Sequence, residues 1–141
     1  MTDDIYLLDN NILARLTRDQ RRSGSLRARC FITEDVLHEA RGFAEEVTDL
    51  QVRPVTGAVL AQLKRVMESI APSDTSLVDL YANKGSADPV LVATALDMAD
   101  EEAQTLMPRP IVLVTEDKAV ALTCQKLGVT TLGFDNFLQI L

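Results

Sequence analysis

Four acidic residues that lie far apart in the sequence could together hold a divalent metal ion. They are Asp9, Glu39, Asp88 and Asp117. Carboxylate oxygens are the ligands that Mg²⁺ and Mn²⁺ prefer in proteins, whereas acids that converge without a metal raise one another's pKa values. Zinc is not expected, because the chain has a single histidine, two cysteines and no zinc-ligand spacing. The group therefore indicates a site for Mg²⁺ or Mn²⁺.

Asp9 and Asp88 can each also be interpreted as helix caps. Asp9 follows the apolar run 5–8 and precedes a predicted helix. Asp88 precedes Pro89 and a strongly apolar stretch, which is the favoured arrangement of an N-cap and a first helical residue. A carboxylate can cap a helix with one oxygen and bind a metal with the other, so the two roles are compatible.

Glu39 and Asp117 also have alternative interpretations. Glu39 borders an apolar helical stripe that begins at Val36, so it leans toward the interior, where a charge needs a partner or a metal. It could equally lie at the edge of the core with its charge in water. Asp117 could be a first-turn acid of a helix over 116–127 that Thr115 caps.

Strands and helices are predicted to alternate along the chain. Apolar runs predict strands over 5–8, 30–32, 111–114 and 129–132, with a possible edge strand near 53–55. Helical spacing predicts helices over 10–22, from Thr33 onward, and over 57–70, 75–81, 89–103, 116–127 and 135–141. The alternation predicts an α/β fold, a three-layer α/β/α sandwich with a mainly parallel central sheet. With 141 residues and no linker, we expect a single domain over 1–141.

The charge of the chain is unevenly distributed. The formal net charge is −7, which argues against a general nucleic-acid binder. Six arginines nevertheless lie between positions 15 and 29, opposed there only by Asp19. Arg15, Arg18 and Arg22 would share one side of the predicted helix over 10–22. They could guide RNA phosphates toward Asp9 or simply form a solvated face.

The composition favours a cytoplasmic protein with no membrane contact. The acidic start of the chain does not resemble a secretory signal, and the apolar runs are too short to span a bilayer. The cysteines, Cys30 and Cys124, are too few for a disulfide framework and suit a reducing compartment.

Together, the four acidic segments resemble a known pattern. The segments 5–11, 31–41, 87–96 and 111–117 are similar in order and spacing to the four motifs of PIN domains. The third segment opens an Ala-rich helix with an acid, and the fourth leads from a strand to a hydroxyl and then to an aspartate. These two are the most specific, and the similarity extends over nearly the whole chain.

The resemblance implies a PIN-like, Rossmann-like fold and a Mg²⁺- or Mn²⁺-dependent endoribonuclease that hydrolyses RNA phosphodiester bonds. Asp9, Asp88 and Asp117 would bind the metal, and Glu39 would be a further ligand or would position the attacking water. Asn11 and Thr115 would support these ligands through hydrogen bonds. The size is closest to that of VapC-like toxins of toxin–antitoxin pairs, which implies a homodimer and a small antitoxin protein as partner.

One residue departs from the PIN pattern and leaves other functions open. The family usually has Thr or Ser after the first aspartate, and this chain has Asn10. A non-catalytic PIN-like scaffold that binds RNA or protein is therefore an alternative. A phosphoryl-accepting receiver domain, with Lys118 as its late lysine, is a third hypothesis, which the predicted helices in the middle of the chain disfavour.

Overall fold

The computed structural model describes residues 3–40, 49–70 and 87–141, apart from the side chains of Ala87 and Asp88. The predicted helix over 75–81 lies outside this part of the chain. Within it, five strands form one sheet in which all neighbouring strands are parallel. The strands are β1 (Ile5–Leu8), β2 (Cys30–Thr33), β3 (Gln51–Arg53), β4 (Ile111–Val114) and β5 (Thr130–Leu132), in the spatial order β3-β2-β1-β4-β5.

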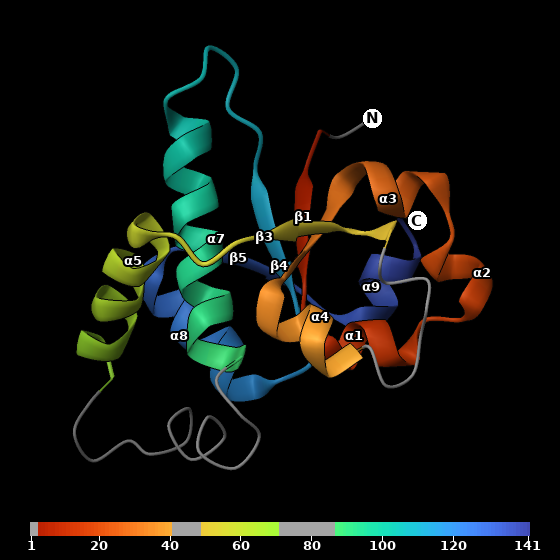
Figure 1. The fold of residues 1–141 in the computed structure, drawn as a ribbon, viewed down its shortest axis with the longest axis horizontal. Coiled ribbons are helices and arrows are strands. Elements are labelled where there is room, and N and C mark those ends of the chain that lie inside the picture. The colour runs from red at the N-terminus through yellow and green to blue at the C-terminus, as the bar shows by residue number, and fades with distance from the viewer. Residues whose placement is uncertain (1–2, 41–48, 71–86) are drawn as a thin grey trace.

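Helices connect the strands and cover both faces of the sheet (Figure 1). The helices of the first part of the chain are α1 (Asn10–Arg15), α2 (Arg18–Arg21), α3 (Gly24–Arg29) and α4 (Glu34–Ala40). Later in the chain come α5 (Gly57–Glu68), α7 (Ala87–Ala103), α8 (Lys118–Leu127) and α9 (Phe134–Leu138). No helix in the described part of the chain is long and apolar enough to cross a membrane.

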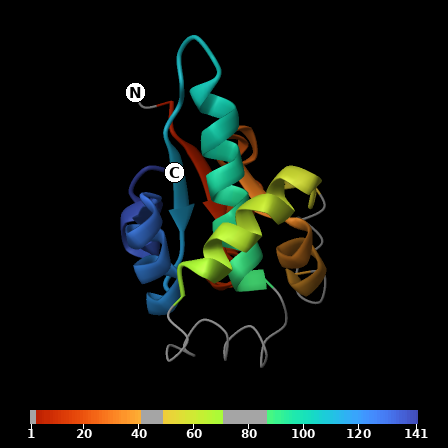
Figure 2. The same cartoon turned by 90° about the vertical axis from the view of Figure 1, so that its left-hand side faces the viewer.

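Each face of the sheet has its own hydrophobic core, because successive residues of a strand point to opposite faces. Tyr6 and Leu8 pack with residues of α1, α3, α4 and α9, whereas Ile5 and Leu7 pack with residues of α5, α7 and α8. Figure 1 shows α1, α3, α4 and α9 on one side of the sheet and α5, α7 and α8 on the other, and Figure 2 shows α5 crossing α7 on the second side. The predicted three-layer α/β/α sandwich with a parallel sheet is confirmed.

The central strands β1 and β4 are buried along their whole length. Helices cover both of their faces, so every position needs an apolar side chain, and such strands read as continuous apolar runs. Both were therefore predicted with the bounds that the structure has.

The prediction of one helix over 10–22 is wrong. Leu16 and Thr17 have extended backbone angles and separate α1 from α2. Thr17 starts α2 with a capping box: its hydroxyl accepts a hydrogen bond from the Gln20 N–H, and the Gln20 side chain accepts one from the Thr17 N–H. The apolar spacing continues across this break, which is why spacing alone predicted a single helix.

Other boundaries were predicted with mixed success. Thr33 caps α4 as predicted, since its hydroxyl accepts a hydrogen bond from the Val36 N–H at 3.1 Å. Gly128 ends α8 as predicted, with a left-handed φ of 78°. Ser23 separates α2 from α3, as the predicted break required, and its side chain also caps α3. Asp88 lies within α7, not immediately before the helix as predicted.

Candidate metal and nucleic-acid site

The candidate site lies where the two central strands end. Leu8 of β1 pairs with Val114 of β4, and the chain leaves these strands in opposite directions. From β1 it passes through α1–α3 to β2 on one side, and from β4 through α8 to β5 on the other. In parallel sheets, ligands bind in the crevice that opens at such a switch point, outside the carboxyl ends of the strands. Asp9 and Thr115 are the first residues after β1 and β4.

Asp9 is buried, with 4% of its surface exposed. It is the N-cap of α1, and its Oδ1 accepts a hydrogen bond from the Asn10 N–H at 2.7 Å. Its Oδ2 accepts hydrogen bonds from the Thr115 hydroxyl at 2.7 Å and from the Asn11 side-chain amide at 3.3 Å. These donors fix the orientation of the carboxylate. Asp9 thus has the predicted capping role and also contacts residues that lie more than a hundred positions away.

Thr115 connects Asp9 to the start of α8. Its hydroxyl donates to Asp9 and accepts a hydrogen bond from the Asp117 N–H at 3.0 Å. Asp117 itself caps α8, because its Oδ1 accepts hydrogen bonds from the backbone N–H groups of Ala119 and Val120. The interpretation of Asp117 as a first-turn acid of a helix capped by Thr115 is therefore wrong. The Thr115 hydroxyl donates to Asp9, and the N-cap of α8 is Asp117.

Asn11 joins the two loops of the site. Its side chain donates to Asp9 Oδ2, and its Oδ1 accepts a hydrogen bond from the Glu116 N–H at 3.4 Å. The structure thus brings Asp9, Asn11, Thr115 and Asp117 together, as the sequence predicted.

Glu39 belongs to α4, which packs against α1. Glu39 is exposed, so the expectation that it leans toward the interior is wrong. The desolvation that remains, followed by the negative charges of Asp9 and Asp35, raises the pKa of the Glu39 carboxyl above 4.5, and His38 opposes this effect. The effect of Asp9 places Glu39 within the electrostatic field of the candidate site. A bound cation would remove this repulsion, which is the behaviour expected of acids that share a metal site.

The fourth predicted acid, Asp88, is the second residue of α7, and its side chain lies outside the described part of the structure. Among the side chains of residues 3–40, 49–70 and 89–141, no three acids, histidines or cysteines lie close enough to hold one ion. The oxygen donors that are described nevertheless suit a hard cation. Asp117 uses Oδ1 for its cap, and its Oδ2 has no hydrogen bond among the described residues.

Asn10, which departs from the PIN pattern, has an unusual environment. Its side-chain Oδ1 is buried and accepts no hydrogen bond from the described residues. A buried acceptor without a donor costs about 1–3 kcal/mol, so each such group in a folded protein needs an explanation. The sequence identified the departure, but only the structure shows the unmet hydrogen bond.

The arginines of segment 15–29 divide into two groups. Arg21 donates to the carbonyl oxygens of Leu13 and Leu16, Arg29 contacts Asp4 O and Tyr6 Oη, and Arg27 pairs with Asp49. These three therefore attach the helices to their surroundings. Arg15, Arg18 and Arg22 are exposed. Because the helix breaks after α1, Arg15, Arg18 and Arg22 do not share one helix face. The prediction that they would is therefore wrong.

A contact at the rim of the site was not predicted. Arg15 Nη1 lies 3.1 Å from Glu116 Oε1, and the Arg15 guanidinium lies over the ring of Phe134, 4.2 Å from its centroid. Three segments of the chain meet here, and no local pattern signals this contact.

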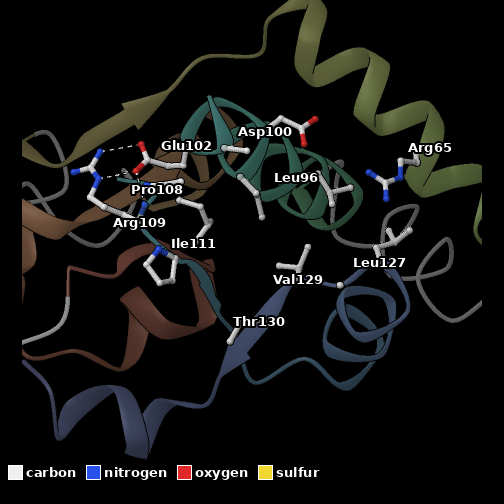
Figure 3. A pocket seen from close by; sticks show the side chains of 15 residues that line it. Arg65, Leu96, Asp100, Glu102, Pro108, Arg109, Ile111, Leu127, Val129 and Thr130 are labelled. Atoms are coloured by element: carbon white, nitrogen blue, oxygen red, sulfur yellow. Dashed lines mark hydrogen bonds and ion pairs between the residues drawn. The ribbon is translucent and has the colours of Figure 1, made fainter. Parts of the chain in front are cut away.

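A separate pocket of about 520 Å³ lies at the opposite edge of the sheet, beside the starts of β4 and β5 (Figure 3). Leu96, Ile111 and Val129 contribute apolar lining, and Arg109 at its rim is held by two side-chain hydrogen bonds to Glu102. None of the four predicted acids lines it. The pocket is therefore distinct from the candidate site.

Comparison of the chain with protein-family models and with curated proteins finds no match. The similarity to PIN domains therefore rests on the four sequence segments.

Proposed function

We propose that this chain is a metal-dependent endoribonuclease of the PIN type. The observation that carries the proposal is the assembly of Asp9, Thr115 and Asp117 at the switch point between β1 and β4. This position lies outside the carboxyl ends of the strands, where ligands of parallel sheets bind, and the ends of the sheet hold the acids in place. The third acid, Asp88, is at the start of α7, the helix that leads into β4.

In this proposal Asp9, Asp88 and Asp117 hold Mg²⁺ or Mn²⁺, and Glu39 is a further ligand or positions the attacking water. When bound, the ion would neutralise phosphodiester charge and make water a better nucleophile at neutral pH. Thr115 and Asn11 orient the Asp9 carboxylate through their hydrogen bonds. Exposed Arg15, Arg18 and Arg22 attract the RNA backbone.

The biological setting that we propose is that of a VapC-like toxin in the cytoplasm, a homodimer held inactive by a small antitoxin protein. A cluster of acids would accept an antitoxin arginine, whose guanidinium matches a carboxylate. The test is whether the product of an adjacent short reading frame binds the chain and stops RNA cleavage.

A non-catalytic scaffold that binds RNA or protein is the second candidate. It is favoured by Asn10 in place of the usual hydroxyl and by the three hydrogen bonds that the Asp9 carboxylate already accepts. On this alternative the acids are helix caps and structural acceptors, and no metal is required.

Metal titration by thermal shift separates the two functions without knowledge of the substrate. Wild-type protein, Asp88→Asn and Asp117→Asn would be titrated with Mn²⁺ and Mg²⁺, with the exposed Asp135→Asn as control. Asparagine caps helices about as well as aspartate, so Asp117→Asn should fold while losing a charged ligand. The nuclease proposal expects a metal-dependent rise in Tm for the wild type and the control that is reduced in the other two variants.

RNA cleavage by the same proteins completes the test. Metal-dependent cleavage by the wild type and by Asp135→Asn, lost in Asp88→Asn and Asp117→Asn, would support the nuclease. RNA or protein binding with no metal response and no cleavage would favour the scaffold.

A further inference from the structure

The guanidinium of Arg15 is held in a defined position at the rim of the candidate site. It lies 4.2 Å from the ring centroid of Phe134, a buried residue at the start of α9. A guanidinium stacked on an aromatic face loses little further entropy when it binds an anion. About half of the Arg15 side chain, 51%, remains exposed. The group is therefore both positioned and open to solvent.

The present partner of Arg15 is Glu116. The two side chains make one contact of 3.1 Å, and 42% of the Glu116 side chain is exposed. Exposed ion pairs of this kind contribute only about 0.2–1 kcal/mol. The Glu116 backbone, in contrast, is fixed by its hydrogen bond to Asn11. The carboxylate can therefore leave Arg15 without disturbing the loop that carries Thr115 and Asp117.

Both members of the pair lie close to the acids. Arg15 is six residues after Asp9, and α1 rises by about 1.5 Å per residue, so their backbones are separated by about 9 Å along the helix. Glu116 is between Thr115, which donates to Asp9, and Asp117. An RNA strand bound at the acids would therefore have the Arg15–Glu116 pair beside it.

We propose that Arg15 binds an RNA phosphate adjacent to the one that is cleaved, and that Glu116 is the resident counter-ion which this phosphate replaces. The inference rests on the proposed ribonuclease function. It assigns Glu116 as an intramolecular competitor of the substrate and Phe134 as the platform that positions Arg15.

The other arginines of the segment fit this role less well. Arg21, Arg27 and Arg29 are engaged by backbone carbonyls, Asp49 or Tyr6, and Arg18 also has an interaction within the fold. Arg22 is exposed on the far side of the break after α1. Arg65, an exposed residue of α5 that has no proposed role, serves as the matched control for a loss of positive charge, and exposed Glu68 of the same helix serves for a loss of negative charge.

The experiment measures binding of a fluorescent single-stranded RNA of mixed sequence in Mg²⁺, in an Asp88→Asn background that blocks cleavage. Arg15→Gln should weaken binding and reduce the slope of log K against log salt by about 0.7, the value for one lost phosphate contact on a single strand. Glu116→Gln should tighten binding about two- to fivefold, because a competitor is removed. When Arg15→Gln and Glu116→Gln are combined, the tighter binding expected of Glu116→Gln alone should disappear. Arg15→Lys keeps the charge but should not restore the full affinity, since lysine does not stack on Phe134 in the same way.

The controls define what would overturn the inference. Arg65→Gln and Glu68→Gln change the net charge by the same amounts as Arg15→Gln and Glu116→Gln and should have smaller effects. If Glu116→Gln matches Glu68→Gln, or Arg15→Gln matches Arg65→Gln, the inference is wrong. The ribonuclease proposal would still stand if protein with Asp88 intact cleaves the same RNA. If that protein neither binds nor cleaves RNA, both proposals fail.

Discussion

Replacing Thr115 by valine tests whether the hydroxyl between the two central strands holds the site together. Valine has nearly the same shape, so the change leaves no large cavity at this buried position. It removes the 2.7 Å hydrogen bond to Asp9 Oδ2 and the acceptor that the Asp117 N–H contacts at 3.0 Å.

The expected cost follows from these two hydrogen bonds. A hydrogen bond to a charged group contributes about 1.5–3 kcal/mol and a neutral one about 0.5–1.5 kcal/mol. Asp9 keeps the donors of Asn10 and Asn11, so its carboxylate is not left bare. We therefore expect the free energy of unfolding to fall by about 2–4 kcal/mol, a substantial fraction of the total for a domain of this size.

Urea unfolding at pH 7 without added metal measures this difference, with Thr94→Val as the control. Thr94 is also buried, but its hydroxyl donates to the carbonyl oxygen of Val90 within its own helix. That carbonyl also accepts a backbone hydrogen bond, so the control should lose less than about 1 kcal/mol. The reasoning is refuted if Thr115→Val costs no more than Thr94→Val while the m-value is unchanged.

Three further predictions concern other parts of the fold. Burial, with added repulsion from Glu101, raises the pKa of Asp97 above 3.8 despite Arg53. The folded state therefore holds this proton more tightly than the unfolded chain, and the wild type loses stability through Asp97 as pH rises above that value. In urea unfolding, the stability of Asp97→Asn relative to the wild type should therefore be higher at pH 7 than at pH 4. A stability difference that is the same at both pH values would contradict this. Burial raises the pKa of Cys30 and of Cys124 to about 12, so both thiols should resist Ellman's reagent at pH 8 until urea unfolds the protein. Gly128→Ala should lower the free energy of unfolding in urea by about 1 kcal/mol, because φ is 78° at this position. The added Cβ would meet no atom within 4 Å, so the cost comes from the backbone alone. An unchanged unfolding midpoint would show that this strain is absent.

Local features of the sequence determined most of the architecture. The runs Ile5–Leu8 and Ile111–Val114 are apolar throughout because parallel strands covered on both faces need apolar side chains at every position. Thr33 and Gly128 signalled a helix start and a helix end because capping and left-handed backbone depend on the residue itself. Since parallel strands end at one edge, the acids that closely follow two such strands, Asp9 and Asp117, could be placed at that edge from sequence.

Tertiary structure decided which partners these residues have. Asp117, not Thr115, caps α8 because the pairing of β1 with β4 brings the Thr115 hydroxyl to Asp9, 106 positions away. The contact of Arg15 with Glu116 and Phe134 depends on the same pairing together with that of β4 with β5, the strand before α9. Local patterns encode burial and backbone preference, whereas contacts between distant segments depend on strand order and register. The sequence could therefore identify the acids, but their hydrogen bonds, and the counter-ion beside them, were set by the folded sheet.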